Sequence, residues 1–156
     1  MEQVCHVRWM IRRDLPRVME IDGLCFEFPW SEEEYIRCLR QRNCIGMVAE
    51  RGDEIVGFMI YELHNNRIDL LALGVDPNYG RRGVGSAMID RLISKLSPGR
   101  RDRITCCVVD VNLDANSFFR SLGFKASRVH RGTAAGGMDE YGMVYRVKEV
   151  KEVSDG

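Results

Sequence analysis

The sequence predicts an α/β fold (α+β), in which a mixed central sheet of about six to seven strands is flanked by about four helices. Short apolar or alternating runs of strand length are separated by segments with helical spacing. A glycine-rich loop after Val75 leads into a helix and another strand, which is typical of a parallel pair joined by a helical crossover. The predicted strands cover residues 4–8, 46–50, 55–63, 67–75, 104–109, 124–130 and 140–147, and the predicted helices cover 15–25, 31–41, 86–96 and 112–122.

Two capping signals place the first helices. Asp14 precedes a stripe of inward-facing apolar residues and is the predicted N-cap of the helix over 15–25. Ser31, with Glu34 three positions later, forms a capping box that starts the second helix and turns Tyr35 inward. Turns at 51–53 and 64–66 then join three successive antiparallel strands that arrive at the glycine loop.

Two loops have a composition of their own. Phe26-Glu27-Phe28-Pro29-Trp30 gathers three aromatics around a proline between the first two helices. These aromatics form either a small satellite core or one wall of a substrate groove, since functional residues concentrate on loops. The glycine- and alanine-rich segment 132–137 is predicted to be a flexible loop.

Length and composition indicate one domain over 1–147, followed by a charged tail at 148–156. The chain is 45% hydrophobic and 29% charged with zero formal net charge, which argues against nucleic acid as a partner. No apolar run approaches the length of a membrane span and no signal peptide is evident. We therefore expect no membrane partner, a cytoplasmic location, and a monomer or weak homodimer.

The six cysteines fall at 5, 25, 38, 44, 106 and 107, without a C-x-x-C pair or zinc-ligand spacing. We expect them to be reduced and mostly buried. Cys106 and Cys107 should point to opposite faces of their strand. His6, His64 and His130 are scattered, so we expect no metal site.

The segment around Gly80-Arg81-Arg82-Gly83-Val84-Gly85-Ser86 is the most informative motif in the chain. Backbone N–H groups, a helix N-terminus and positive charge together suit an anion, most often a phosphate. A simple turn in which glycine supplies a positive φ is the alternative. The segment lacks the P-loop pattern, and the third glycine of a dinucleotide fingerprint is Met88. Another nucleotide-binding use of the loop stays open.

The loop belongs to a longer succession of motifs, with V-D-P-x-Y before it and an asparagine and L-G-F after it. In that order these stretches resemble the GNAT superfamily of N-acetyltransferases, and within it the ribosomal-protein-alanine N-acetyltransferases and related protein N-terminal acetyltransferases. The resemblance covers most of the chain. The supporting stretches are Arg13–Pro16, Cys25–Phe26, Pro29–Glu33, Val48–Glu50, Ile55–Gly57, Leu70–Tyr79, Arg82–Gly85, Asn112–Ala115 and Phe119–Phe124.

The resemblance implies a GNAT fold and acetyl-CoA as co-substrate. It implies that the loop and the following helix N-terminus hold the pyrophosphate, and that the preceding strand pairs with the pantetheine arm and polarises the thioester carbonyl. Asn112 matches the family's cofactor-contacting asparagine, and helix N-capping is an equally good explanation of it. The implied cofactor-binding residues are Leu73, Gly74, Val75, Arg81, Arg82, Gly83, Val84, Gly85, Ser86, Asn112 and Phe119.

The chain departs from the family pattern where proton transfer is expected. The family's glutamate base is replaced by Cys107 and its tyrosine acid by Phe119, so the catalytic residues are unknown from the sequence. Gly80 also replaces the arginine or glutamine that usually opens the loop, and the acceptor hairpin lacks paired tyrosines. Substitute acids or bases are Asp69 and Tyr141, with Tyr35, Tyr145 and Cys107 itself as further candidates.

The resulting hypothesis is an acetyl-CoA-dependent N-acetyltransferase in which an amine attacks the thioester directly, without a covalent enzyme intermediate. The acceptor is expected to be a protein N-terminal α-amine, because roughly 10–20% of such an amine is neutral at pH 7, against under about 0.1% of a lysine. A small-molecule amine as acceptor, and a catalytically weak acyl-CoA-binding module, remain the alternatives.

Overall fold

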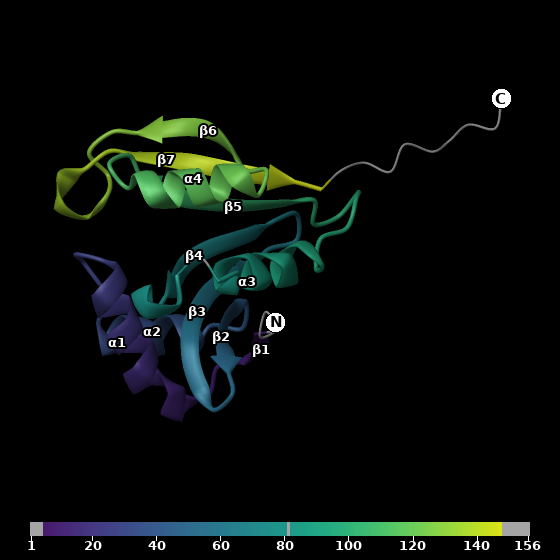
Figure 1. Cartoon of the computed structure of the whole chain (residues 1–156). Coiled ribbons are helices and arrows are strands. Elements are labelled where there is room, and N and C mark those ends of the chain that lie inside the picture. Colours follow the sequence, from purple (N-terminus) through teal and green to yellow (C-terminus); the bar gives the residue numbers. More distant parts are fainter. Residues whose placement is uncertain (1–4, 81, 148–156) are drawn as a thin grey trace, which may run out of the picture.

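The structure, a computed structural model, describes residues 5–80 and 82–147. Across these residues seven strands form one mixed sheet in the order β1-β2-β3-β4-β5-β7-β6 (Figure 1). All neighbours are antiparallel except β4 and β5, which are parallel as predicted. Arg81 and the predicted tail at 148–156 lie outside the described residues. The strands are β1 (His6–Trp9), β2 (Cys44–Arg51), β3 (Glu54–Leu63), β4 (Ile68–Val75), β5 (Arg103–Val109), β6 (Lys125–His130) and β7 (Glu140–Arg146).

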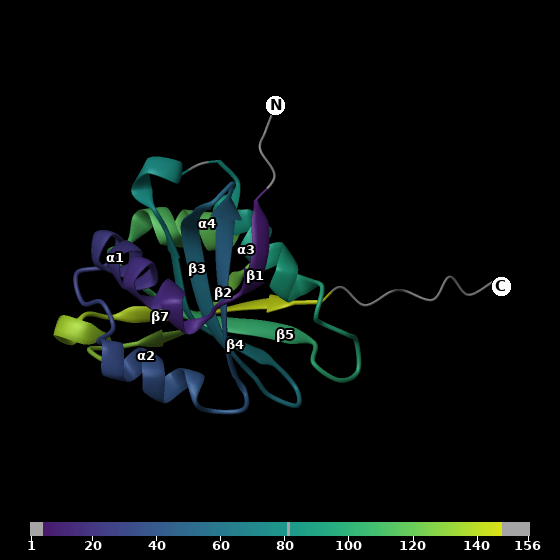
Figure 2. The ribbon, with the colours of Figure 1, turned by 90° about the horizontal axis from the view of Figure 1, so that it is seen from below.

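The four predicted helices are α1 (Leu15–Cys25), α2 (Glu32–Leu39), α3 (Val84–Ile93) and α4 (Leu113–Ser121). Helices α1 and α2 build one apolar core with β2 and β3, while α3 and α4 build a second core with β3, β4 and β5 on the other face (Figures 1 and 2). In the described residues no helix is long and apolar enough to cross a membrane.

The start of α1 corrects one sequence prediction. Asp14 stands at the N-cap position, but its side chain makes no capping hydrogen bond to the helix. Its carboxylate instead pairs with Arg8 of β1 at 2.8 Å and accepts the N–H of Ile11. Ser31 does cap α2, accepting the N–H of Glu34 at 3.2 Å as the capping box predicts.

The cysteines give a second correction. Cys38 and Cys44 form a disulfide with their Cα atoms 6.1 Å apart, because the end of α2 turns straight into the start of β2. Cys107 is exposed and Cys5 and Cys25 are half-buried, so the expectation of mostly buried thiols was also wrong. Cys106 is buried, and it points to the opposite face from Cys107 as predicted.

Candidate functional site

The centre of the site is the place where β4 and β5 separate. The two strands pair only at Ile68 with Ile104 and at Asp69 with Thr105. Opposite β3, residue Ile60 pairs with Ala72 and Tyr61 with Leu70, so Leu71 is an extra residue, a β-bulge. Beyond the bulge, β4 has no partner on its β5 side among the described residues. Apart from the carbonyl of Val75, which accepts the thiol of Cys25, the edge of β4 over 71–75 is therefore free to pair with an extended ligand.

The glycine loop follows this free edge. Gly83 has a φ of 80° and is the N-cap residue of α3, and a Cβ built on it would meet nothing within 4 Å. Helix α3 has no side-chain cap. The N–H groups of Val84, Gly85 and Ser86 open the helix, where N–H groups lack intrahelical partners. Open space, orphan donors and the positive end of a helix dipole together suit a phosphate group.

Gly85 has a packing role that the sequence did not indicate. A Cβ on it would lie 3.0 Å from Cζ of Phe118 on α4. The glycine therefore allows close packing of α3 on α4, in addition to any approach of a ligand. Arg82 is exposed, and its guanidinium lies 5.9 Å from the ring centre of Tyr79.

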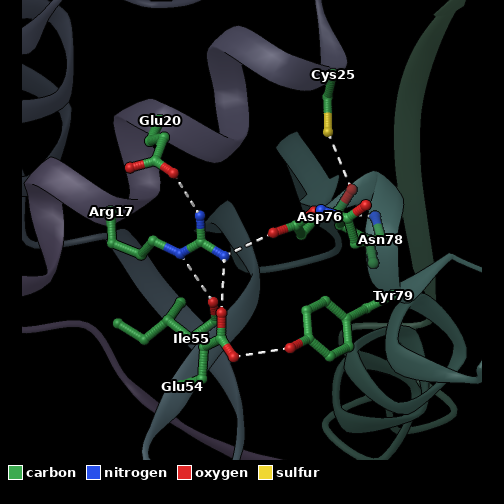
Figure 3. A network of polar contacts seen from close by, with 9 residues as sticks. Arg17, Glu20, Cys25, Glu54, Ile55, Asp76, Asn78 and Tyr79 are labelled. Carbon is green, nitrogen blue, oxygen red and sulfur yellow. Dashed lines mark hydrogen bonds and ion pairs between the residues drawn. The ribbon is translucent and has the colours of Figure 1, made fainter.

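An ion-pair network that the sequence did not reveal holds the turn before the loop (Figure 3). Arg17 of α1 donates to the buried Asp76 at 2.6 Å and to the carbonyl of Ile55 at 3.1 Å. Asp76 also accepts the N–H of Asn78, and this backbone bond, followed by Arg17, lowers the pKa of the Asp76 carboxyl. Only the tertiary fold brings Arg17 to this turn.

Beside it, Tyr79 donates its hydroxyl hydrogen bond to Glu54 at 2.7 Å, and the thiol of Cys25 donates to the carbonyl of Val75 at 3.1 Å (Figure 3). The last residue of α1 thus contacts the last residue of β4. These contacts hold the end of β4 and the start of the loop against α1 and the β2–β3 hairpin.

Asn112 caps α4 by accepting the N–H of Ala115 at 3.1 Å, which confirms the capping explanation. One turn later, Asn116 is buried and donates to the carbonyls of Val109 at 3.2 Å and of Asn112 at 2.8 Å. Its Oδ1 atom is buried without a hydrogen-bond partner in the described residues. Asn116 therefore joins the end of β5 to α4 and keeps one acceptor free beside the strand separation.

Asp69 is engaged by its neighbours. Arg67 donates to it at 2.9 Å, Thr105 donates its hydroxyl, and His64 lies 3.0 Å away. Burial alone would raise the pKa of Asp69, but the hydrogen bonds from Thr105 and Arg67 outweigh it and lower that pKa. A base should have a pKa near the operating pH. These contacts therefore favour a structural role for Asp69.

His64 and Asp69 also meet Glu62, with one donor atom of each within 4.8 Å of the others. The scattered histidines of the sequence did not predict this group. The carboxylate of Asp69 already accepts hydrogen bonds from Arg67 and Thr105. We therefore interpret the three residues as a polar cluster at the start of β4.

Among the aromatic candidates, Phe119 and Tyr35 are buried and Tyr141 and Tyr145 are partly buried. Phe119 is 6% exposed, with Phe118 and Phe124 each 5.1 Å away between ring centres. Tyr141 and Tyr145 pack against the α3–α4 core. Tyr35 is fully buried and donates to Asp22, and burial raises the pKa of its hydroxyl far above the ordinary value. The hydroxyl of Tyr35 is thus a structural donor.

Two loops meet at the open end of the strand separation (Figure 2). The ring of Phe28, between α1 and α2, lies so close to Gly136 that a Cβ there would be 3.1 Å from Cε2. The loop over 132–137 forms a short 3-10 turn (Ala135–Gly137), in which the N–H of Gly137 donates to the carbonyl of Ala134 and the N–H of Ala134 donates to the carbonyl of Met138. A hydrogen-bonded turn thus stands where the sequence predicted a flexible loop.

The two alternatives for the aromatic segment both hold in part. Trp30 packs on Tyr35 with ring centres 5.2 Å apart and belongs to the satellite core. Phe28 is 50% exposed and Phe26 is 38% exposed, so these rings can line a groove.

Comparison with known proteins agrees with this arrangement. A model of the acetyltransferase (GNAT) family matches residues 15–124. The ribosomal protein bS18-alanine N-acetyltransferase of Escherichia coli (strain K12) is 28% identical over 118 residues, covering 76% of this chain and 79% of that protein.

Two solved structures share the fold. The crystal structure of the ribosomal-protein-S18-alanine N-acetyltransferase from Escherichia coli has a TM-score of 0.82 at 23% identity, covering 96% of this chain and 98% of that chain. Arabidopsis thaliana NAA60 in complex with acetyl-CoA has a TM-score of 0.81 at 19% identity, covering 92% and 100%. The predicted GNAT fold is confirmed, and the chain belongs to the acetyltransferase (GNAT) family of acyltransferases.

Proposed function

We propose that this protein is a cytoplasmic enzyme that transfers the acetyl group of acetyl-CoA to the α-amine of a protein N-terminus. The observation that carries the proposal is the separation of β4 from β5 after the bulge at Leu71, which opens between an uncapped helix N-terminus and the Phe28–Gly136 contact. The 28% identical relative is named for acetylation of an alanine of a ribosomal protein.

The residues present fit acetyl-CoA. Val84, Gly85 and Ser86 offer N–H groups to the pyrophosphate, and Gly83 leaves space for it. The free edge of β4 over 71–75 offers backbone groups to the pantetheine amides. An N–H on the same edge would polarise the thioester carbonyl in the manner of an oxyanion hole.

The chemistry of the site favours an amine of low pKa. Phe119 has no proton to donate, and Asp69 is engaged by Arg67 and Thr105. An α-amine with a pKa of roughly 7.7–8.0 needs less help in losing its proton than a lysine at about 10.4. The leaving thiolate, with a pKa near the ~8.5 of a cysteine, departs without a strong acid.

The test measures CoA thiol release from acetyl-CoA with three acceptors. These are a short peptide with a free N-terminal alanine, the same peptide with a blocked N-terminus and an internal lysine, and a polyamine. We expect turnover with the free N-terminus alone. Turnover restricted to the polyamine would show a small-molecule enzyme, and tight acetyl-CoA binding without turnover would show an acyl-CoA-binding module.

A further inference from the structure

One face of β5 and β7 carries ionisable side chains away from the helices. Cys106 and Val108 of β5 point into the α3–α4 core, so Cys107 and Val109 point to the opposite face. Cys107 pairs with Gly142 of β7, and Val109 pairs with Glu140. Directly opposed residues share a face, and diagonal neighbours lie within reach of long side chains. Glu140 is thus the diagonal neighbour of Cys107.

Side chains of β6 stand over Gly142, the cross-strand partner of Cys107. A Cβ on Gly142 would lie 3.3 Å from Nε2 of His130 and 3.7 Å from Cβ of Arg128, so these β6 side chains stand over the glycine. His130 is also the cross-strand partner of Glu140. The thiol, the carboxylate and the imidazole therefore lie together on one face of the sheet, beside the strand separation.

The carboxylate of Glu140 accepts few hydrogen bonds from the described residues. Thr133, in the loop that touches Phe28 through Gly136, donates to it weakly at 3.4 Å. The thiol of Cys107 also interacts with it. Partial burial of this thiol, then the charge of Glu140 and a hydrogen bond to it, raise the pKa of Cys107, so the thiol is protonated at neutral pH. No arginine or lysine holds Glu140 in the hydrogen bonds of the described chain, in contrast to Asp69.

We propose that Glu140 is the general base, accepting a proton from the acceptor amine directly or through one water. The groups on its face of the sheet are Cys107 on β5 and Arg128 and His130 on β6, with Thr133 in the β6–β7 loop and Asp69 acting on Cys107 from β4. Glu140 lies at the start of β7, next to the loop that borders the groove. The inference rests on the proposed function in so far as that function supplies an amine acceptor.

The proton and electron balance is complete. Glu140 takes one proton from the ammonium, and the freed nitrogen lone pair forms a C–N bond with the thioester carbonyl carbon. The C–S bond breaks and its electron pair leaves on sulfur. The second proton on nitrogen passes to that sulfur, giving the amide and CoA thiol. Glu140 then releases its proton to water.

The experiment compares Glu140→Gln with the full-length parent over pH 6–9.5, with acetyl-CoA and the amine that the parent uses. At pH 7 we expect kcat/KM to fall about 100-fold or more. The deficit should shrink above about pH 8, where the α-amine deprotonates unaided. Glu33→Gln, on the exposed start of α2, is the matched control and should behave as the parent. A pH-independent loss would indicate a merely structural role and overturn the proposal.

Asp69→Asn tests the rival carboxylate. If its loss at pH 7 disappears at high pH while Glu140→Gln keeps the parent profile, Asp69 is the base and Glu140 is not. Turnover of small amines alone would refute the N-terminal acceptor, while the Glu140→Gln profile would still decide the role of Glu140. A parent chain that acetylates no amine contradicts both proposals.

A readout independent of turnover is alkylation of Cys107 by iodoacetamide, followed by peptide mass analysis. Because Glu140 raises the pKa of this thiol, Glu140→Gln should move the pH profile of Cys107 alkylation to lower pH. Cys25, whose thiol donates to the carbonyl of Val75, is the internal control, and the pH profile of its alkylation should not change. An unchanged Cys107 profile would show that the two side chains do not interact, and the proposal would fail.

Discussion

The guanidinium of Arg17 on α1 lies 2.6 Å from the carboxylate of Asp76, the residue that begins the turn before the glycine loop. Arg17→Ala leaves this buried carboxylate without its cation and Ile55 without its donor. We expect the free energy of unfolding to fall by about 1–3 kcal/mol and acetyl-CoA affinity to fall with it. Urea denaturation and calorimetric titration measure the two effects. Arg37→Ala, at an exposed position on α2, should change stability by less than about 0.5 kcal/mol.

Acid should loosen the same turn. The pKa of Asp76 is lowered by the N–H of Asn78 and then by Arg17, and the pKa of Asp14 is lowered first by its hydrogen bond from Arg8. Both folded-state values lie below the unfolded value near 4. Their stabilisation is therefore complete above about pH 4 and is lost as the pH falls through the folded values.

Asp76→Asn separates this contribution from general acid denaturation. This substitution should lower the free energy of unfolding by about 1–3 kcal/mol at pH 7. Between pH 5 and pH 3 the free energy of unfolding of the variant should fall less than that of the parent, as measured by urea denaturation at each pH. A parent and variant with parallel pH dependence would contradict the assignment to Asp76.

Substitution of the two loop glycines, Gly83 and Gly85, should destabilise the protein for different reasons. Gly83→Ala places a side chain at φ 80° in otherwise open space, costing about 1–2 kcal/mol of stability and weakening acetyl-CoA binding. Gly85→Ala forces a Cβ to within 3.0 Å of Phe118 and should cost about 1–3 kcal/mol through overpacking.

Thermal denaturation of Gly85→Ala with Phe118→Leu checks this reason. The shorter side chain should restore part of the stability lost by the single glycine substitution, whereas Phe118→Leu should not improve Gly83→Ala. Equal effects of Phe118→Leu on both glycine variants would exclude the packing explanation.

Phe28 should contribute to acceptor binding rather than to stability. Its ring is 50% exposed and rests on Gly136 of the opposite loop. We expect Phe28→Ala to raise KM for the peptide about tenfold, the equivalent of ~1.4 kcal/mol of aromatic contact, with kcat and the KM for acetyl-CoA little changed. Phe28→Tyr keeps the ring and is the control. Steady-state kinetics with each substrate varied in turn measure both KM values. A change in the KM for acetyl-CoA alone would contradict this role of Phe28.

Local patterns were enough to predict the elements that depend on neighbours in the chain. Helix α1 spans the predicted residues 15–25, and the Ser31 capping box places α2. The predicted N-cap hydrogen bond of Asp14 is absent because its carboxylate pairs instead with Arg8, on a separate strand. A capping propensity states what a side chain does without competitors, and a tertiary ion pair is such a competitor.

The glycine loop of the candidate site was predictable from the sequence, whereas the groups that we propose for proton transfer were not. The loop at 82–86 is contiguous, so its glycines are visible in the sequence. The neighbourhood of Cys107 and Glu140 depends on the register of β5 against β7, which side-chain volumes and the β7 turn decide only in the folded sheet. A lone glutamate at the start of a strand carries no local signal of such a partner.

The alternation of apolar residues along β4 does not predict the opening between β4 and β5, and Leu71 shows why. Before it, Ile68 and Leu70 face the α3–α4 core; after it, Ala72 packs toward α1 and α2, and Leu73 and Val75 toward α3 and α4. A chain without Leu71 would keep each of these side chains on its present face, with both cores satisfied. It would form a regular β4 with no bend to part it from β5. Burial alone therefore does not require Leu71, and we expect its removal to close the opening at which we propose that the substrate binds.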